Sequence, residues 1–287
     1  MLTVVVGITS ALIFGAADFL GGLAAKRMSA ILTTAVASLT GFVVLALALP
    51  VLGGQWSRDA VLLGVASGIV GAIAIGLLYA SLAIGPMSIL SPLTAVVSAI
   101  VPVTVELVQG QRLGPIGYWA IGLALVAVVL VGFVPERGAV RPRITGVLMA
   151  IGSGASIGAF LIIINATPDD SGIVPLVVNR ATNAGIMFAL VGILALIAVR
   201  RATGPVHGAW RMGLRLAIAC GVVDVIANLG LLLGIRLGEL SVIAVLTALY
   251  PAGTIILAAV VLKERIAPVQ YAGLALALVA GAMLALA

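Results

Sequence analysis

Charged residues are scarce in this sequence: Lys, Arg, Asp and Glu together make up 8% of its 287 residues. An ordinary soluble domain carries roughly 25% charged residues and needs them to cover its surface. Hydrophobic residues instead account for 63% of the chain. The composition therefore excludes a water-soluble globular protein and predicts a chain whose main solvent is lipid.

Cysteine and histidine are also nearly missing, with one residue each, Cys220 and His207. A single cysteine excludes an intrachain disulfide framework or a thiolate cluster, so we expect no metal site and no cofactor. Residues 154–158, GASIG, formally match a G-x-S-x-G nucleophile pattern, but they fall inside a predicted helix and the histidine falls in a loop. We therefore expect no catalytic residues and no enzymatic activity.

Long apolar stretches are what the sequence has in place of charge. They follow one another along nearly the whole chain, and each approaches the roughly 20 residues that a helix needs to cross a bilayer. They do not alternate as the strands of a membrane barrel would. The stretches are residues 3–25, 30–52, 59–82, 86–108, 114–134, 146–165, 173–199, 213–235, 240–262 and 267–287. This pattern predicts an all-α membrane protein with ten transmembrane helices.

Lys and Arg residues gather in the connections on one side of these helices. Ten lie on that side: Lys26, Arg27, Arg137, Arg141, Arg143, Arg200, Arg201, Arg211, Lys263 and Arg265. Three lie on the other: Arg58, Arg112 and Arg236. Since positive loops stay in the cytoplasm, the distribution predicts a multi-pass protein of the inner (plasma) membrane with both termini outside. Cations at helix ends also argue against a nucleic-acid partner, leaving the lipid bilayer and a small molecule as partners of a monomer.

The second half of the chain repeats the first. A shift of 153 residues aligns residues 85–99 with 238–252 without a gap, and LALVA occurs both at 123–127 and at 276–280. We predict a first five-helix repeat at residues 1–137 and a second at 138–287, which together form one integrated transport unit. An odd number of helices inserts the second repeat upside down. Inverted repeats around a central cavity are typical of transporters that work by alternating access.

Residues 246–286, LTALYPAGTIILAAVVLKERIAPVQYAGLALALVAGAMLAL, resemble the drug/metabolite transporter superfamily, specifically its EamA-type ten-helix exporters. Gln111 stands where these exporters commonly have an acid, which leaves Glu264 without a charged counterpart. The resemblance implies a central cavity for amino acids, nucleosides, sugars or related metabolites, and within that range looks most like the YddG-type aromatic amino acid exporters. It also implies cytoplasmic termini, opposite to the prediction from charge.

Together these observations predict a secondary transporter that exports small metabolites, foremost amino acids with aromatic or other apolar side chains. A membrane channel or lipid-handling protein is the alternative, and an intramembrane enzyme is a more distant one.

Ionisable residues at membrane depth cost roughly 2.5 to 3.5 kcal/mol each on insertion scales and therefore mark function or internal pairing. Asp224 lies near the middle of its predicted helix, with Asn228 one turn later on the same face. Asp224 either contacts a substrate ammonium or pairs with Arg180 to hold two helices together. We expect a local structural role for Asp18 and surface pairing for Glu106.

Polar residues near prolines complete the predicted site. Proline removes a backbone hydrogen bond, and irregular backbone at membrane depth usually lines a cavity. Thr94 aligns with Thr247 across the repeat, and a tyrosine offers both a ring and a hydroxyl to an amphipathic guest. The predicted substrate-binding residues are Tyr79, Thr94, Arg180, Asp224, Asn228, Thr247 and Tyr250. The predicted cavity or hinge residues are Asp18, Ser91, Pro92, Ser98 and Pro251.

Overall fold

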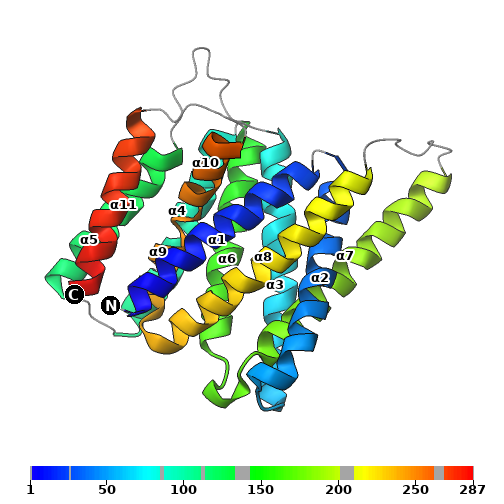
Figure 1. The fold of residues 1–287 in the computed structure, drawn as a ribbon, viewed down its shortest axis with the longest axis horizontal. Coiled ribbons are helices and arrows are strands. Elements are labelled where there is room, and N and C mark those ends of the chain that lie inside the picture. The colour runs from blue at the N-terminus through cyan, green and yellow to red at the C-terminus, as the bar shows by residue number, and fades with distance from the viewer. Residues whose placement is uncertain are drawn as a thin grey trace.

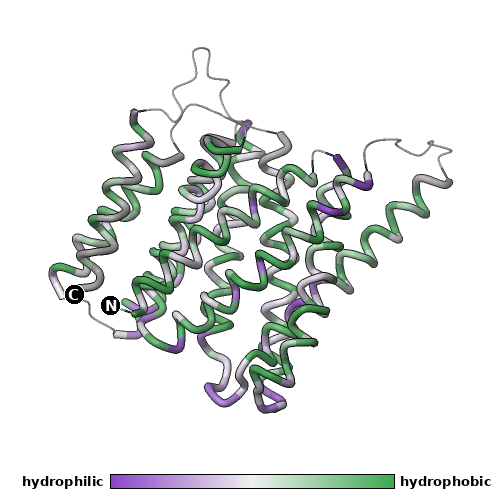
Figure 2. The backbone as a smooth tube through the Cα atoms, viewed as in Figure 1, coloured by the Kyte–Doolittle hydropathy of each residue, from purple (hydrophilic) through white to green (hydrophobic). Residues whose placement is uncertain are grey.

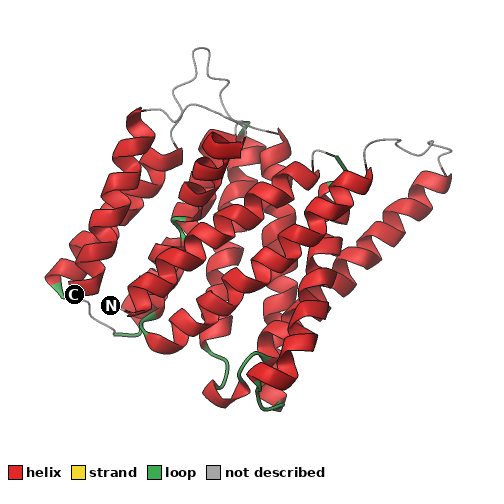
Figure 3. Cartoon of the chain, viewed as in Figure 1, coloured by secondary structure: helices red, strands yellow, loops and turns green. Residues whose placement is uncertain are grey.

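The computed structural model describes residues 2–25, 27–84, 87–110, 114–132, 143–200, 210–261 and 268–286. The regular elements of these residues are all helices, drawn red in Figure 3. In chain order they are α1 (Leu2–Ala25), α2 (Ala30–Leu52), α3 (Arg58–Ile84), α4 (Met87–Val108), α5 (Pro115–Gly132), α6 (Ile144–Asn165), the 3-10 helix η1 (Asp169–Ser171), α7 (Val174–Arg200), α8 (Trp210–Leu237), α9 (Leu240–Thr247), α10 (Tyr250–Val261) and α11 (Pro268–Leu286).

Each of the ten predicted apolar stretches coincides with helix in the described part of the chain. Nine stretches form one helix each, and the stretch 240–262 forms two, α9 and α10. By length and composition six of the described helices can span a membrane, in α1, α2, α3, α6, α7 and α8. Shorter apolar helical segments occur at Leu93–Val108, Pro115–Leu130 and Leu240–Thr254. The chain is therefore a multi-pass helical membrane protein.

The outer surface of the bundle confirms that lipid is its solvent. Figure 2 shows hydrophobic residues along the helices and hydrophilic residues concentrated toward their ends. Large apolar side chains are widely exposed, among them Leu47 at 73%, Val51 at 85% and Leu196 at 67%. A soluble protein does not expose so much contiguous apolar surface, whereas a bilayer solvates it.

The helices pack in a pattern that is preserved when α1–α5 are exchanged with α6–α11, with α9 and α10 together as the counterpart of α4. α1 packs on α8 as α6 packs on α3, and α2 packs on α8 as α7 packs on α3. Likewise α4 packs on α6 as α9 and α10 pack on α1, while α2 contacts its own counterpart α7. In Figure 1 the two chain ends lie at one edge of the bundle, and α6 runs in the direction opposite to α1.

Small residues allow the helix backbones to approach closely at these crossings. A Cβ atom placed on Gly154 of α6 would lie 2.6 Å from the backbone oxygen of Thr94 in α4, and one on Gly158 would lie 2.6 Å from Cβ of Val101. Both positions therefore require glycine, as expected for small residues spaced one turn apart in membrane helices. At the same crossing a Cβ on Gly158 would also lie 3.2 Å from Cδ of Pro102, and α4 continues as one helix past this proline.

Candidate functional site

A cavity of about 850 Å³, counting its open mouth, lies among helices of both halves. Residues of α1, α3, α4, α6, α7, α8, α9 and α10 line it. The apolar part of the lining includes Phe14, Ile75, Leu78, Ile157, Phe160 and Leu231. Its polar part consists of Asp18, Ser98, Asn179, Arg180, Asn183, Asp224, Asn228, Thr247 and Tyr250. The cavity thus combines an apolar wall with a small set of polar groups, as small-molecule sites commonly do.

An ion pair between Arg180 of α7 and Asp224 of α8 crosses one side of the cavity. The side chains keep 13% and 25% of their exposure, so both charges are largely removed from solvent. Gly41 of α2 makes room for the arginine, because a Cβ there would lie 3.3 Å from its Cδ atom. Nε of Arg180 is buried and has no hydrogen-bond partner among the described residues. The sequence left open whether Asp224 pairs with Arg180 or contacts a substrate ammonium, and the structure contains the ion pair with Arg180.

Asn228 lies one turn after Asp224 on the same strip of α8, as the spacing predicts. Its amide nitrogen donates a hydrogen bond to the backbone carbonyl of Asp224 at 2.8 Å. This bond fixes the orientation of the amide at the cavity wall.

Asp18 of α1 lines the same cavity but lacks a comparable partner. Its side chain is partly exposed there, and no hydrogen bond or ion pair joins it to another described residue. The expected local structural role therefore has no contact to support it in the described part of the chain.

The break between α9 and α10 lies at the cavity and follows from Pro251. A proline ring clashes with the carbonyl four residues earlier and cannot donate to it, and that residue is Thr247, the last of α9. The helix tightens instead, since the amide of Leu249 donates to the carbonyl of Leu246 at 3.1 Å. Oγ1 of Thr247 is buried with no hydrogen-bond partner among the described residues, while Tyr250 lines the cavity.

Thr94 does not share the position of Thr247, despite their alignment across the repeat. It is fully buried, and its hydroxyl donates to the carbonyl of Leu90 at 3.0 Å and to that of Ala150 in α6 at 3.2 Å. Thr94 therefore lies at the α4–α6 crossing and is not among the described residues that line the cavity, and its role in substrate binding stays a prediction. Ser98, one turn later, does line the cavity.

Three predicted residues cannot be placed in the same way. The side chains of Tyr79, Ser91 and Pro92 lie outside the described part of the structure, although their backbones belong to α3 and α4. α4 is helical across Pro92, so the first half has no counterpart of the α9–α10 break within the described residues.

Two asparagines of α7 belong to the site although the sequence analysis passed over them. Asn179 donates to Oγ of Ser67 in α3 at 3.0 Å, and Asn183 accepts from Oγ of Ser38 in α2 at 3.1 Å. Both asparagines are buried and line the cavity. Their spacing of one turn, beside Arg180, marks a polar stripe on an otherwise apolar helix and could have revealed them.

Glu106 near the end of α4 stabilises the start of α9 rather than pairing at the surface. Its two carboxylate oxygens accept hydrogen bonds from the amides of Leu240 at 3.2 Å and Ser241 at 2.8 Å, and the residue is 6% exposed. The first amides of a helix lack intrahelical acceptors and attract negative charge. The predicted surface pairing is therefore wrong, because the partner lies far along the chain.

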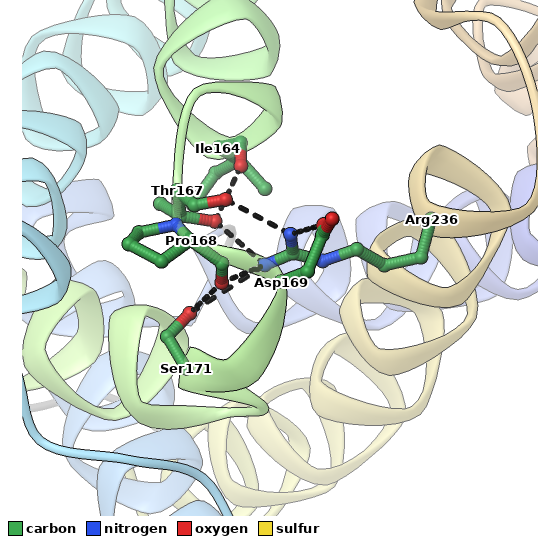
Figure 4. Close-up of polar contacts among 6 residues, drawn as sticks. All are labelled: Ile164, Thr167, Pro168, Asp169, Ser171 and Arg236. Carbon is green, nitrogen blue, oxygen red and sulfur yellow. Dashed lines mark hydrogen bonds and ion pairs between the residues drawn. The ribbon is translucent and has the colours of Figure 1, made fainter.

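Arg236, in the last turn of α8, holds the connection between α6 and η1 (Figure 4). Nη1 donates to the carbonyl of Thr167 at 2.9 Å, and Nη2 donates to Oγ1 of Thr167 and to the carbonyl of Pro168, each at 2.9 Å. The guanidinium also pairs with the exposed Asp169. Glu106 and Arg236 thus fasten the ends of helices at the edge of the bundle that carries both termini.

Comparison with known proteins gives a family match for the second half of the chain and a fold. Residues 144–286 match the EamA-like transporter family, which supports the predicted relation to the drug/metabolite transporter superfamily. No curated protein sequence gives a significant match. A protein known from a crystal structure superposes with a TM-score of 0.76, covering 99% of this chain and 98% of its own, at 17% sequence identity. That structural likeness shows a shared fold.

Proposed function

We propose, from the EamA-like transporter match of residues 144–286, that this protein is a secondary transporter of small metabolites with apolar amino acids as its first substrate class. The observation that carries the proposal is the cavity between the two halves, where an apolar wall surrounds the Arg180–Asp224 pair. Polar and ionisable groups at membrane depth are expensive and typically mark a substrate or ion pathway.

The proposed mechanism is alternating access between two inverted five-helix repeats, residues 1–137 and 138–287, acting as one unit in a monomer. Two observations support it: the helix contacts are preserved on exchange of the halves, and α1 and α6 run in opposite directions. The interruption between α9 and α10 places irregular backbone beside the cavity, where discontinuous helices of transporters bind substrate. Access would alternate by movement of one repeat against the other.

The chemistry of the lining supports an amphipathic, charged substrate. Asp224 and Arg180 provide opposite poles between which the ammonium and carboxylate of an amino acid would insert. Phe14, Phe160 and Tyr250 provide rings against which an apolar or aromatic side chain would pack. Export from the cytoplasm across the inner membrane, with both termini outside, completes the proposal.

Transport in reconstituted vesicles tests this function. The purified protein is placed in proteoliposomes, and uptake of labelled phenylalanine, tryptophan and leucine is measured with and without a pH gradient, beside empty liposomes. We expect saturable uptake that Asp224→Asn strongly reduces and Asp59→Asn, a change in the exposed first turn of α3, leaves intact. Uptake no greater than in empty liposomes for every amino acid would overturn the substrate assignment, and non-saturable flux would favour a channel.

A further inference from the structure

The described lining of the cavity contains more acidic than basic side chains. Among the described residues that line it, the carboxylates are Asp18 and Asp224, and the cationic side chain is Arg180. Arg180 already pairs with Asp224, whereas Asp18 has no ion pair or hydrogen bond to any described residue. One carboxylate of the lining is therefore not compensated by an ion pair with any described residue.

No cation other than Arg180 lines the cavity among the described residues. Arg27, the described cation nearest to Asp18 along the chain, lies nine residues beyond it and past the end of α1 at Ala25. Its side chain is exposed. Since an isolated carboxylate at membrane depth is costly, the cavity is suited to a cargo that brings its own positive charge.

The residue one turn before Asp18 on α1 is an aromatic ring that also lines the cavity. Phe14 and Asp18 are four residues apart, which places their side chains on one helix face. Phe160 of α6 lines the same space. A carboxylate beside aromatic rings is a favourable environment for an organic ammonium, because the ring face attracts the cation and the rings also contact its apolar body.

We propose that Asp18 binds the ammonium group of an organic amine with a net charge of +1, whose apolar or aromatic body lies along Phe14 and Phe160. This inference rests on the proposed transport function and extends its substrates from amino acids to cationic amines. A zwitterionic amino acid binds less tightly in this scheme. Its carboxylate enters a cavity in which the guanidinium of the described lining is already paired with Asp224.

Three probes that share a phenylethyl body and differ in charge test the inference: phenethylamine, phenylalanine and 3-phenylpropionate. Their equilibrium binding to the purified full chain in lipid nanodiscs is measured at neutral pH, which avoids leakage of the amine through vesicles. Both phenethylamine and phenylalanine offer an ammonium to Asp18, but only phenylalanine must also bury a carboxylate beside a guanidinium that is already paired. Because a buried charge without a partner is costly, we expect phenethylamine to bind at least about tenfold more tightly. 3-Phenylpropionate should bind most weakly.

Asp18→Asn should bring the affinities for phenethylamine and phenylalanine close together, while the matched Asp59→Asn control keeps the preference for the amine. If Asp18→Asn does not fold, the relative affinities of the three probes for the unaltered protein still test the inference. Equal affinity for the amine and the amino acid, retention of the preference in Asp18→Asn, or no binding of any probe would overturn the inference. Saturable amino acid uptake in proteoliposomes would still support the transporter proposal in each of those cases.

Discussion

Two threonines that align across the repeat, Thr94 and Thr247, use their hydroxyl groups differently. Thr94 donates to two carbonyls at the α4–α6 crossing, while the hydroxyl of Thr247 is buried beside the cavity without a described hydrogen-bond partner. The same side chain at aligned positions therefore contributes to packing in one half and lines the cavity in the other.

Substitution by valine separates these two roles. Thr94→Val should lower the free energy of unfolding by about 1 kcal/mol, since a buried hydrogen bond is lost. Thr247→Val should leave the free energy of unfolding nearly unchanged, because its hydroxyl has no hydrogen-bond partner among the described residues. It should weaken saturable uptake if the hydroxyl binds substrate, as proposed. Unfolding in detergent and proteoliposome uptake measure the two effects. Equal destabilisation by both changes would show that Thr247 has a partner within the protein.

The Arg180–Asp224 pair has a measurable coupling energy because both side chains are largely buried. Removal of either charge alone leaves the other uncompensated, so Arg180→Gln and Asp224→Asn should each destabilise the protein strongly. The double variant should be less destabilised than the sum of the two, with a coupling energy of about 1 to 3 kcal/mol. A double-mutant cycle on unfolding free energies gives this value, and strict additivity would contradict the prediction.

At the scale of elements, α9 is a helix of 8 residues whose start is stabilised from another helix. Glu106→Gln should remove part of this interaction and cost about 1 kcal/mol, the usual value of an N-terminal cap. Amide hydrogen exchange should become faster at Leu240 and Ser241, the two amides that donate to Glu106. Unfolding and exchange measurements together test whether the contact stabilises α9.

Glu239→Gln is the matched control for this change. Glu239 is the N-cap residue of α9, yet its side chain makes no capping hydrogen bond and is exposed. Its substitution should therefore leave both stability and exchange nearly unchanged. An equal effect of the two changes would show that general acidity near α9, rather than the Glu106 contact, stabilises the helix.

At the scale of the whole molecule, the orientation in the membrane can be read from two loops. Gln55 lies in the connection between α2 and α3, at the edge that carries both termini, and Met28 lies in the connection between α1 and α2 at the opposite edge. The Lys and Arg distribution predicts that the first edge faces outside. The orientation implied by the family resemblance is the reverse. Measuring which of the two loops is accessible from outside the cell therefore distinguishes the two orientations.

Single-cysteine labelling of intact cells decides between these orientations. In a Cys220→Ser background, Gln55→Cys should react with a membrane-impermeant maleimide and Met28→Cys should react only after the cells are opened. The matched pair controls for expression and reagent access. Reaction of Met28→Cys alone in intact cells would reverse the predicted orientation.

The sequence by itself determined the class of protein and the positions of its helices. Lipid offers no hydrogen bonds to the backbone, so long apolar runs must become helices and their ends can be read from composition. Pro251 was marked as a hinge for a similarly local reason, since proline cannot continue the hydrogen-bond ladder. The same rule also marked Pro92, across which α4 stays helical, so the position of the break was not determined by proline alone. Asp18, Arg180 and Asp224 were recognisable as unusual because any charge stands out in an apolar helix.

Only the tertiary structure decided how those groups are arranged. The direction of a side chain depends on how its helix is rotated and on which helices pack against it. These neighbouring helices lie far apart in the sequence. Arg180 reaches Asp224 because Gly41 of a third helix leaves space, and Glu106 meets α9 more than a hundred residues later. Thr94 and Thr247 share a register but face different neighbours, because alignment fixes position along a helix and packing fixes what surrounds it.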